Sequence, residues 1–447
     1  MDVRNQVFFV LGVSKSGSAV AEYVLSKGGK CYVYDRLEEE IVEKNISKLV
    51  GKGAIRVKDE KVDEIMDEID VFVISPGVPI NHEIAVKAKR KGKYIIGELE
   101  FGFQCCLPSV VAVTGTNGKT TTCSIIQQIF EKCGRKSLLV GNVGQPLTSK
   151  IGEVDRDTVC VTEVSSFQLE SVNAFAPHVS CVLNIAPDHL ERHYTMENYL
   201  FLKKRIFRNQ REGEYCILNY DDEMVREFHK ESRAKTVWVS CKEKVNGAYC
   251  LGNNVYFKDT LITTTDKISL KGEHNVYNCM FAIAVAKLYG VSNSDVANAL
   301  ENVKGVKHRI EFVANIQGKN YYNDSKATNV ASTLTAVKSM EAQTVLIVGG
   351  SEKGETYEKL FDSLKNSQVK HVIITGATKY EMLKCALKVG YNKFTVTGDF
   401  EVAVKIASMV ATEGESILFS PACASFDLFK NYEERGEKFI SLVRSMS

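Results

Sequence analysis

The chain has 447 residues, of which 25% are charged and 44% hydrophobic, and its formal net charge is +2 at pH 7. This length is sufficient for two to four domains, each with its own core. A nearly balanced charge offers no basic field for nucleic acid or for an anionic membrane. The 13 cysteines are scattered, with no CxxC pair and no Cys/His cluster, which argues against a disulfide framework and against structural zinc.

The cysteine pattern also favours a reducing compartment. The N-terminal segment MDVRNQVFFVLGV has no signal-peptide layout, and no apolar run approaches the roughly 18 residues of a membrane span. We therefore expect a cytoplasmic, globular enzyme.

The first hundred residues have the outline of a Rossmann unit. An apolar run over residues 7–13 enters a turn with Gly12 and Gly17, and a second apolar strand over residues 31–34 ends at Asp35. An acidic residue about 20 positions after the glycines is typical of dinucleotide-binding folds. Because Ser14 stands where the middle glycine belongs, the fingerprint indicates a nicotinamide cofactor only weakly. A dehydrogenase is the first alternative.

A second candidate ligand turn follows a buried strand in the same region. Residues 71–74 are apolar and end in Ser75-Pro76-Gly77, and another short strand covers residues 94–96. In doubly wound sheets, ligands bind at the carboxyl ends of strands. We predict a nucleotide-recognition domain over residues 1–98.

A strand, a glycine-rich turn and a helix follow at residues 110–132. This arrangement directs backbone N–H groups and a helix N-terminus toward a phosphate. Lys119 would reach the β- and γ-phosphates, and the Thr120 hydroxyl would hold Mg²⁺. The position five before Gly118 is Val113 rather than glycine, so the spacing departs from the common P-loop. We predict a nucleoside triphosphate site formed by Gly115, Thr116, Asn117, Gly118, Lys119, Thr120 and Thr121.

Polar residues end three further strands, over residues 138–140, 159–161 and 179–183. Among them, Glu163 and His189 could bring a carboxylate and an imidazole to a second metal site, although a hard cation prefers oxygen ligands. By composition alone, residues 201–207 form an amphipathic helix with a basic, solvated face, which would make Lys203 a surface residue.

In the last third, strands over residues 345–348, 371–374, 394–396 and 417–419 alternate with helical patterns, which predicts another parallel α/β unit.

Several strings in this order resemble the signature of the Mur ligase superfamily, the ATP-dependent amide-forming enzymes of peptidoglycan precursor synthesis. They are GTNGKTT (115–121), EVSSFQLE (163–170), NIAPDHLERH (184–193), FLKKRIF (201–207) and GEHNVYN (272–278). The later strings DSKATN (324–329) and SPACASFDLFKNYEERGEKF (420–439) resemble the branch that acts on D-glutamate. The match runs essentially the full length.

The resemblance implies an α/β fold of three domains. These are an N-terminal Rossmann-like UDP-binding domain (1–98), a central P-loop-type ATPase domain (99–304) and a C-terminal Rossmann-like domain (305–447). It implies ATP and two Mg²⁺ ions as cofactors, with Lys203 carbamylated. The implied substrates are UDP-N-acetylmuramoyl-L-alanine and D-glutamate, joined through an acyl phosphate. We expect a bacterial monomer with no nucleic acid or membrane partner.

The resemblance also assigns roles to single residues. Lys119, Glu163, His189 and Lys203 would be catalytic, and Thr120, Glu163, His189 and Lys203 would hold metal. Besides the phosphate loop, ATP would contact Asn275, Asn278, Arg309 and Asp324. Candidate contacts of the UDP-substrate are Ser16, Asp35, Arg36, Ser75, Gly77, Asn142, Ser165, Gln168 and His189. D-Glutamate would contact Lys326, Thr328, Lys353, Ser425, Phe426 and Tyr432.

Some of these residues have plainer interpretations. Asn275 has the residue type of a helix cap. Cys423, in a serine-rich turn, lacks an evident activating histidine and is rejected as a nucleophile. Two further alternatives stay open: a sibling ligase for another amino acid, which should lack the UDP-binding domain or the Lys353 and SPACAS elements, and a nucleotide-binding switch that forms no amide.

Overall fold

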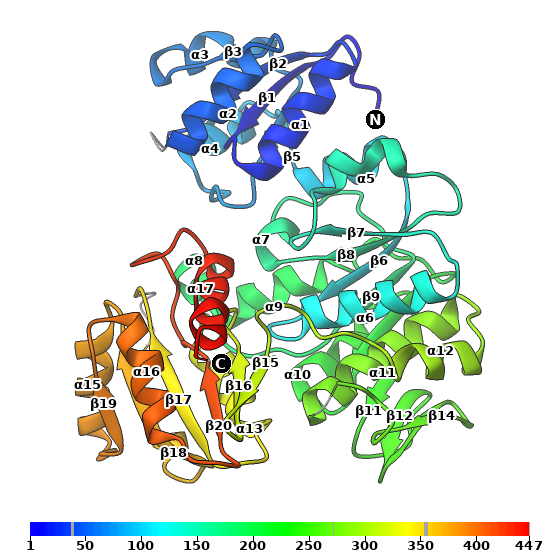
Figure 1. Cartoon of the computed structure of the whole chain (residues 1–447). Coiled ribbons are helices and arrows are strands. Elements are labelled where there is room, and N and C mark those ends of the chain that lie inside the picture. Colours follow the sequence, from blue (N-terminus) through cyan, green and yellow to red (C-terminus); the bar gives the residue numbers. More distant parts are fainter. Residues whose placement is uncertain (37–39, 271, 353–355, 447) are drawn as a thin grey trace. The chain divides into compact units, whose positions relative to one another are not determined.

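The computed structural model describes residues 1–36, 40–270, 272–352 and 356–446 (Figure 1). The chain divides into two compact units, residues 1–269 with 275–303 and residues 270–274 with 304–447. The first unit holds a five-stranded and a nine-stranded sheet, and the second unit holds a six-stranded sheet. Three separate sheets with flanking helices confirm the predicted fold class of three α/β domains. The predicted boundaries at residues 98 and 304 stay predictions.

The N-terminal sheet is fully parallel, with the strand order β3-β2-β1-β4-β5. Alternate residues of β1 face opposite sides, as the pleat requires: Phe8 packs in the core under α1, whereas Phe9 packs in the core under α4. The elements are β1 (Val7–Leu11), α1 (Lys15–Ser26), β2 (Lys30–Tyr34), α2 (Glu40–Val50), β3 (Ile55–Arg56), η1 (Asp59–Lys61), α3 (Val62–Ile65), η2 (Met66–Glu68), β4 (Val71–Ile74), α4 (Glu83–Arg90) and β5 (Tyr94–Gly97).

This strand order places a topological switch point between β1 and β4. The loop with Gly12 leaves β1 toward α1, on one side of the sheet, and the turn at Ser75 leaves β4 toward α4, on the other. Crevices of this kind are where doubly wound sheets bind their ligands. The two glycine- and serine-containing turns singled out in the sequence therefore meet at one edge of the sheet.

The central sheet has the strand order β14-β13-β12-β11-β10-β9-β6-β8-β7, and only β12, β13 and β14 pair antiparallel. Its elements are α5 (Glu98–Cys106), β6 (Ser109–Thr114), α6 (Lys119–Lys132), β7 (Ser137–Gly141), η3 (Leu147–Glu153), β8 (Val159–Glu163), α7 (Ser166–Leu169), β9 (Val179–Val182), α8 (Leu190–His193), α9 (Met196–Lys204), β10 (Tyr215–Asn219), α10 (Glu223–Arg226), η4 (Glu227–Lys230), β11 (Lys235–Ser240), β12 (Gly247–Leu251), β13 (Asn254–Phe257), β14 (Thr260–Thr264), α11 (Glu273–Leu288) and α12 (Asn293–Leu300).

Strand β6 lies in the interior of this sheet, between β8 and β9. Its residues Val110 and Ala112 join the core that α5 and α9 cover. Because its neighbours run parallel to it, the residues that follow β6, β7, β8 and β9 come together at one edge. The phosphate loop follows β6, and the candidate metal ligand Glu163 ends β8.

The sheet of the second unit has the order β15-β16-β20-β17-β18-β19, and β15 alone pairs antiparallel. The sequence analysis identified the four strands β17 to β20 but did not recognise β15 and β16. The elements are β15 (Glu311–Ile316), β16 (Lys319–Asn323), α13 (Val330–Lys338), β17 (Thr344–Gly349), α14 (Glu358–Leu364), β18 (Val369–Thr375), α15 (Lys379–Lys388), β19 (Phe394–Val396), α16 (Phe400–Val410), β20 (Ser416–Phe419) and α17 (Tyr432–Arg444).

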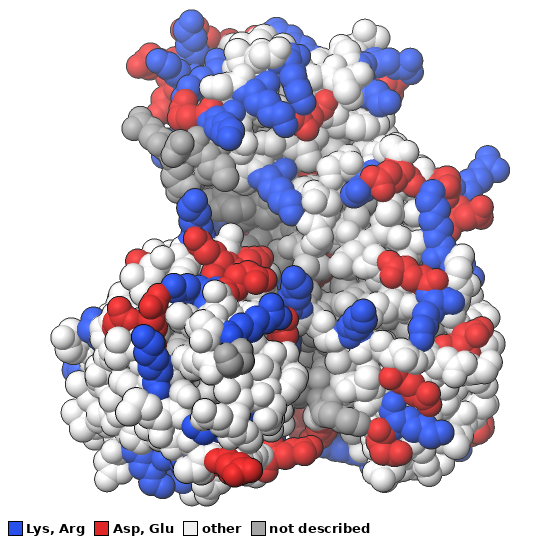
Figure 2. All heavy atoms as spheres, viewed as in Figure 1, with Lys and Arg blue, Asp and Glu red and all other residues white. Residues whose placement is uncertain are grey.

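The surface and the cysteines agree with the composition. Basic and acidic side chains are interspersed on the visible face (Figure 2), as the net charge of +2 leads one to expect. All 13 cysteines lie within the described ranges, and each is a free thiol. Among the helices that the structure describes, none is both long enough and apolar enough to cross a bilayer.

Candidate functional site: a phosphate loop with a buried lysine

The predicted phosphate loop connects β6 to α6 through two glycines in conformations that side chains disfavour. The φ angles are 151° at Gly115 and 84° at Gly118. A Cβ atom on Gly118 would lie 2.6 Å from the Asn278 Oδ1 atom, and one on Gly115 would lie 3.0 Å from the Leu183 Cβ atom. The loop therefore needs glycine at these positions both for backbone conformation and for close packing.

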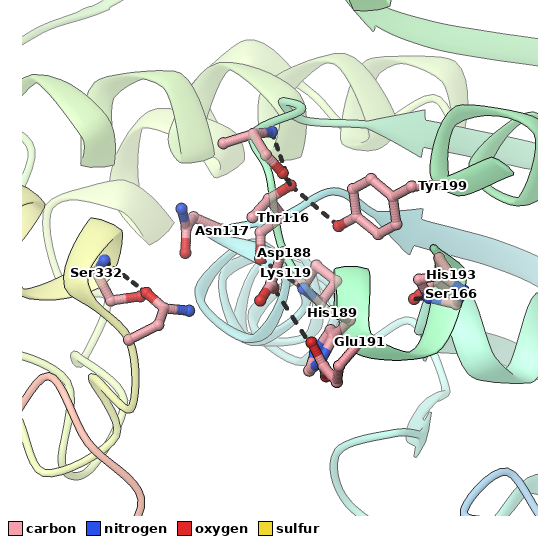
Figure 3. A network of polar contacts seen from close by, with 12 residues as sticks. Thr116, Asn117, Lys119, Ser166, Asp188, His189, Glu191, His193, Tyr199 and Ser332 are labelled. Atoms are coloured by element: carbon pink, nitrogen blue, oxygen red, sulfur yellow. Dashed lines mark hydrogen bonds and ion pairs between the residues drawn. The ribbon is translucent and has the colours of Figure 1, made fainter. Parts of the chain in front are cut away.

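A residue that the sequence analysis did not assign, Asn184, clamps this loop from the end of β9. Its side chain accepts a hydrogen bond from the Asn117 N–H at 2.8 Å and donates to the Asn117 carbonyl at 3.0 Å. Its backbone carbonyl accepts from the Thr116 N–H at 3.0 Å. The Thr116 hydroxyl also lies 3.1 Å from the Tyr199 hydroxyl (Figure 3). Four hydrogen bonds thus fix the loop before any nucleotide binds.

The predicted phosphate lysine is folded back onto its own loop. The Lys119 ammonium donates to the carbonyls of Gly115 and Thr116, both at 2.8 Å. Those carbonyls belong to the turn that would surround a phosphate. The side chain is thus already at the loop, and a bound polyphosphate would compete with these two carbonyls for the ammonium.

Next to the loop, Thr120 and Glu163 form a pair of oxygen-bearing side chains. The Thr120 hydroxyl donates to Glu163 at 2.7 Å, and the Asn142 side chain donates to the other carboxylate oxygen of Glu163 at 2.6 Å. Glu163 is buried, with 2% of its surface exposed. The structure therefore brings together three sequence-predicted residues from α6, β8 and the turn after β7.

Lys203 reaches the same place from α9. Only 1% of the residue is exposed, and its ammonium donates to the Thr114 hydroxyl at 3.0 Å and to the Gly115 carbonyl at 2.9 Å. Burial and the nearby Lys119 ammonium hold the pKa of Lys203 well below its usual range, against the opposing carboxylates of Asp188 and Glu163. Desolvation of this kind favours the neutral amine.

The solvated basic face expected from composition alone is therefore wrong for Lys203. The helix turns Tyr199 and Lys203 inward, while Phe201 is 57% exposed. Lys204 remains near the surface and pairs with Glu231 at 2.5 Å. Tertiary packing against the phosphate loop overrides the local pattern here, because Lys203 finds hydrogen-bond acceptors inside.

His189 does not touch the pair formed by Thr120 and Glu163. It precedes α8 with φ at 54°, and its ring lies 3.3 Å from Glu191 and 3.6 Å from Asp188 (Figure 3). The ring packs on Phe167, with a centroid distance of 4.7 Å. The cluster at the loop thus comprises the hydrogen-bonded Thr120 and Glu163 and, on the adjacent Gly115, Lys203. No hydrogen bond or ion pair found among the described residues joins His189 to it.

The donor types at the cluster fit a hard cation. The hydroxyl of Thr120 and the carboxylate of Glu163 supply oxygen ligands, which Mg²⁺ prefers. An ammonium at Lys203 is not a ligand, and within the described residues no group of three or more His, Cys, Asp or Glu side chains could hold a metal ion. The residues thus fit Mg²⁺ through two oxygen donors, and a third anionic donor would require a change at Lys203.

The two asparagines predicted for the nucleotide base lie on α11, one turn apart. Asn278 is 5% exposed, accepts a hydrogen bond from the Thr122 hydroxyl at 3.1 Å, and donates to Asn275 at 3.2 Å. Since Thr122 is on α6, this contact ties the start of α11 to the helix that follows the phosphate loop. The Asn278 side chain also lies against Gly118 of the phosphate loop.

The candidate UDP-substrate residues of the N-terminal sheet gather at its switch point. Asp35 accepts from the Val13 N–H at 2.8 Å, and the buried Ser75 donates to the Gly12 carbonyl at 2.7 Å. Arg36 donates to the Tyr34 hydroxyl at 3.2 Å and forms an ion pair with Glu83. Gly77 lies in the turn after β4, and Ser16 lies in the first turn of α1.

Two other candidate UDP-substrate residues cap the N-terminus of a helix. Ser165 and Gln168 form a capping box on α7, in which the Gln168 N–H donates to the Ser165 hydroxyl at 3.3 Å and the Ser165 N–H donates to Gln168 at 3.0 Å. Such a box stabilises a helix start. Their role toward substrate stays a prediction.

In the second unit, Asp324 follows β16 and is fully buried. It accepts from the Ser420 hydroxyl at 2.7 Å and from the Ile310 N–H at 3.2 Å. Burial raises the pKa of Asp324 to about 6, although Arg309 and the hydrogen bond from Ser420 act in the opposite direction. Arg309, the other residue predicted to contact ATP from this unit, therefore acts electrostatically on Asp324.

The candidate D-glutamate residues lie around the turn after β20. Ser425 is buried, and Phe426 is 73% exposed, with its N–H donating to Ser351 at 3.0 Å. The Lys326 ammonium lies 5.3 Å from the ring centre of Tyr432. Thr328 follows closely, and its N–H donates to the Lys326 carbonyl at 3.0 Å. Lys353 lies outside the described residues.

A buried arginine missed by the sequence analysis holds this turn. Arg435 of α17 is 2% exposed and donates to the carbonyls of Ala424, Cys423 and Ser325 at 2.7, 3.1 and 2.8 Å. Burial lowers the pKa of Arg435 to about 10. The string EERG gives no local sign of this role, because all three acceptors are distant in sequence. The five-donor fork of arginine suits several carbonyls at once.

Three family profiles match the chain in the order of its three sheets. The Mur ligase MurD-like N-terminal domain matches residues 6–97, the Mur ligase middle domain matches residues 113–286, and the Mur ligase glutamate ligase domain matches residues 308–423. Together with the full-length relatives described next, they show that the chain belongs to the Mur ligase family.

Curated relatives are similar over the whole chain. A protein of Clostridioides difficile (strain 630), named UDP-N-acetylmuramoylalanine–D-glutamate ligase, is 39% identical over 455 residues, which cover 100% of both chains. A protein of Thermoanaerobacter sp. (strain X514) with the same name is 38% identical over 453 residues, again covering 100% of both.

Solved structures share the fold at low identity. MurF from Acinetobacter baumannii is 18% identical with a TM-score of 0.64, and the match covers 98% of this chain and 93% of that one. MurF ligase from Thermotoga maritima, crystallised with ADP, is 16% identical with a TM-score of 0.63, covering 100% and 97%.

Proposed function

We propose that this protein is an ATP-dependent amide ligase that adds D-glutamate to UDP-N-acetylmuramoyl-L-alanine in peptidoglycan precursor synthesis. The observation that carries the proposal is the cluster at the phosphate loop, where the buried Lys203 donates to Thr114 and Gly115 and Thr120 donates to Glu163. The choice of both substrates rests on the names of full-length relatives at 38–39% identity. The cytoplasm, where ATP and nucleotide-linked sugars are present, is the proposed compartment, and the monomeric state stays a prediction.

Nucleotide binding is assigned to the loop of residues 115–121. Backbone N–H groups at the start of α6 would surround the phosphates, as helix N-termini do. The Lys119 ammonium would leave the two loop carbonyls that it now contacts and pair with the β- and γ-phosphates. Asn275 and Asn278 would contact the base, and Arg309 and Asp324 would approach the phosphates and the ribose.

Two Mg²⁺ ions are proposed as cofactors, held by Thr120, Glu163, His189 and a modified Lys203. Bound magnesium would neutralise charge on the transferring phosphoryl group. The modification is a carbamate, formed when the neutral Lys203 amine attacks CO₂ and releases a proton. It would convert a buried cation into an anionic oxygen ligand, and the lowered pKa of Lys203 supplies the neutral amine.

The reaction has two steps. The carboxylate of the UDP-substrate attacks the γ-phosphorus, the bond to the bridging oxygen of ATP breaks, and ADP leaves. The amino group of D-glutamate then attacks the acyl carbon, and the tetrahedral intermediate expels phosphate, which keeps one oxygen of the original carboxylate. Phosphorylation is needed because a carboxylate has no good leaving group. Positioning and charge stabilisation carry the catalysis, and no protein nucleophile is required.

Substrate contacts are proposed at two places. The UDP-substrate would lie against Ser16, Asp35, Arg36, Ser75 and Gly77 and extend to Asn142, Ser165, Gln168 and His189. D-Glutamate would lie against Lys326, Thr328, Lys353, Ser425, Phe426 and Tyr432. Arg435 would fix the turn with Ser425, since it holds the two preceding carbonyls.

The proposal is tested by phosphate release from ATP and Mg²⁺ with UDP-N-acetylmuramoyl-L-alanine, with and without D-glutamate. L-Glutamate, L-alanine and meso-diaminopimelate replace D-glutamate in parallel reactions. Release that requires both the UDP-substrate and D-glutamate supports the proposal. Release with another amino acid would keep the ligase class and overturn the substrate, and no dependence on any amino acid would favour a nucleotide switch.

A further inference from the structure

The turn after β4 packs directly on the glycine loop of the N-terminal sheet. A Cβ atom on Gly12 would lie 2.8 Å from Val78 Cγ2 and 2.9 Å from Ser75 Cβ. One on Gly17 would lie 2.9 Å from the Ser75 hydroxyl. Any displacement of residues 75–78 would therefore displace the loop of Gly12 and Gly17, which forms the other side of the switch point.

One side chain of α8 reaches this turn. Arg192 donates to the Val78 carbonyl at 3.1 Å, and its guanidinium lies 3.5 Å from the carbonyls of Pro76 and Gly77. Three consecutive carbonyls thus face one cation. A second contact joins the same two segments, since the Asn81 side chain donates to the Tyr194 hydroxyl at 3.4 Å.

Arg192 is itself held in a fixed orientation. It pairs with Glu170 through two parallel hydrogen bonds, Nε to Oε1 at 3.1 Å and Nη2 to Oε2 at 2.6 Å. The side chains of Arg192 and Glu170 are only 15% and 8% exposed. The guanidinium carbon lies 4.9 Å from the ring centre of Phe167. Bidentate geometry and low exposure make this pair stronger and more directional than a surface ion pair.

The same cluster extends to the candidate catalytic residues. Phe167 packs on His189 as well as on Arg192. The neighbouring His193 is buried, lies 3.6 Å from Glu170, and is 2.9 Å from the Ser166 hydroxyl. Arg192 is therefore connected to the switch point of the N-terminal sheet on one side and to the edge of the phosphate-loop site on the other.

We propose that Arg192, held by Glu170, is a positioning residue that fixes the turn of residues 75–78 in the conformation that binds the UDP-substrate. This inference rests on the proposed function for the identity of that substrate. A buried ion pair gives little net stability, but it specifies one arrangement of the groups that it joins. Among the described residues, no hydrogen bond or ion pair joins Arg192 to the phosphate loop or to Asn278, and it approaches His189 only through Phe167. Its main effect should therefore be on the UDP-substrate.

The test compares Arg192→Lys and Glu170→Gln with a matched control, Arg135→Lys. Arg135 also donates to a backbone carbonyl, that of Tyr289 at 2.9 Å, and also packs on aromatic rings, but it lies on the loop after α6, away from the switch point. Lysine keeps the positive charge but cannot form the two parallel hydrogen bonds of a guanidinium. Each variant is assayed for KM of all three substrates and for kcat, with thermal melting as the measure of folding.

We expect both site variants to raise the KM for UDP-N-acetylmuramoyl-L-alanine about tenfold, the effect of losing about 1.4 kcal/mol. The KM for ATP and for D-glutamate should stay within about twofold of wild type. Direct titration of the UDP-substrate without ATP should show the same loss of affinity, which separates binding from chemistry. Arg135→Lys should change none of these constants.

Three results would overturn the inference. The first is a wild-type KM for the UDP-substrate in both site variants. The others are an equal loss for all three substrates and failure of both variants to fold, either of which would make the pair merely structural. An inactive wild-type enzyme would instead overturn the proposed function, and the titration without ATP would still report on Arg192.

Discussion

The Lys203 ammonium donates to the Thr114 hydroxyl at 3.0 Å, at a point where 1% of the lysine is exposed. None of the ion pairs found among the described residues includes Lys203. Its other contacts are the Gly115 carbonyl and the face of the Tyr199 ring. A buried cation with only neutral acceptors is costly, which explains why the pKa of Lys203 falls.

The first prediction concerns the substitution Lys203→Met. We expect kcat to fall by at least about a hundredfold, the usual cost of losing a group that stabilises transition-state charge. The free energy of unfolding at pH 6 should stay unchanged or rise by about 1–3 kcal/mol, because burial makes Lys203 harder to protonate in the folded chain than in the unfolded chain, and methionine removes that cost. Steady-state kinetics and chemical denaturation measure the two effects.

The sign of the stability effect follows from the lowered pKa. Between the lowered pKa of the folded chain and the ordinary pKa of the unfolded chain, near pH 10, the unfolded chain binds more protons at Lys203. The free energy of unfolding therefore rises with pH across this window, and the stability that the lysine costs is regained. The advantage of Lys203→Met should therefore shrink between pH 6 and pH 10. A large loss of stability in Lys203→Met at pH 6 would contradict the lowered pKa of Lys203. Carbamylation has its own measurement, a ¹³C NMR carbamate signal from labelled bicarbonate that is absent in the variant.

The second prediction concerns Gly118→Ala. The added Cβ would lie 2.6 Å from the Asn278 Oδ1 atom, and the alanine backbone would have to keep a φ of 84°. We expect a loss of about 2 kcal/mol of stability or more, from the backbone and the clash together, and weaker ATP binding. The matched control is Gly134→Ala, with a φ of 67° and nothing within 4 Å of the added atom, which should cost about 1 kcal/mol. Equal effects in the two variants would show that the clash with Asn278 is unimportant.

The third prediction concerns Asn184, the clamp on the phosphate loop. Asn184→Asp keeps the size and the acceptor for the Asn117 N–H but loses the donor to the Asn117 carbonyl. It also puts a negative charge beside the proposed phosphate site. We expect ATP affinity to fall about tenfold or more, with a smaller change in the KM for D-glutamate. Titration with ADP measures the affinity, and an unchanged affinity would remove Asn184 from the site.

How much of this site could be read from the sequence depends on whether each residue's partners are local. The apolar run before Gly115, the string GTNGKTT and the apolar spacing after it predicted β6, the turn and α6, because these patterns are local properties of the sequence. Lys203 and its neighbours Lys204 and Arg205 are chemically alike, and only the packing of α9 on the phosphate loop decides which of them points inward. Composition gave the wrong answer there, and the family resemblance singled out the residue that is buried.

Residues that act through distant backbone atoms were not found at all. Asn184 holds Asn117, and Arg435 holds the carbonyls of Ala424 and Ser325. Neither contact has a periodicity or a spacing that a single sequence displays. Strands β15 and β16 were missed for a related reason. The edge strand β15 buries only Ile316 and shows no regular alternation, and the polar residues of β16 do not form the apolar run that marks a buried strand.

The fourth prediction concerns the pH dependence of the second unit. The pKa of Asp324 is raised to about 6 from 3.8, so the folded chain binds more protons than the unfolded chain between these values. Its contribution to stability is therefore present below about pH 4 and is lost as pH rises through 6. Asp324→Asn should remove this loss, so that the variant gains on the order of 2–3 kcal/mol relative to wild type between pH 4 and pH 7. Urea denaturation across this range measures the difference, and a pH-independent difference would contradict the raised pKa.

The account as a whole is tested most directly by following one oxygen atom. The UDP-N-acetylmuramoyl-L-alanine carboxylate is labelled with ¹⁸O, the complete reaction with ATP and D-glutamate is run, and the released phosphate is analysed by mass spectrometry. If the carboxylate is activated as an acyl phosphate and then captured by the amino group of D-glutamate, each phosphate carries one ¹⁸O atom. Phosphate without ¹⁸O, whose fourth oxygen comes from water while the label stays in the UDP-linked molecule, would show hydrolysis of ATP without ligation and would contradict the account.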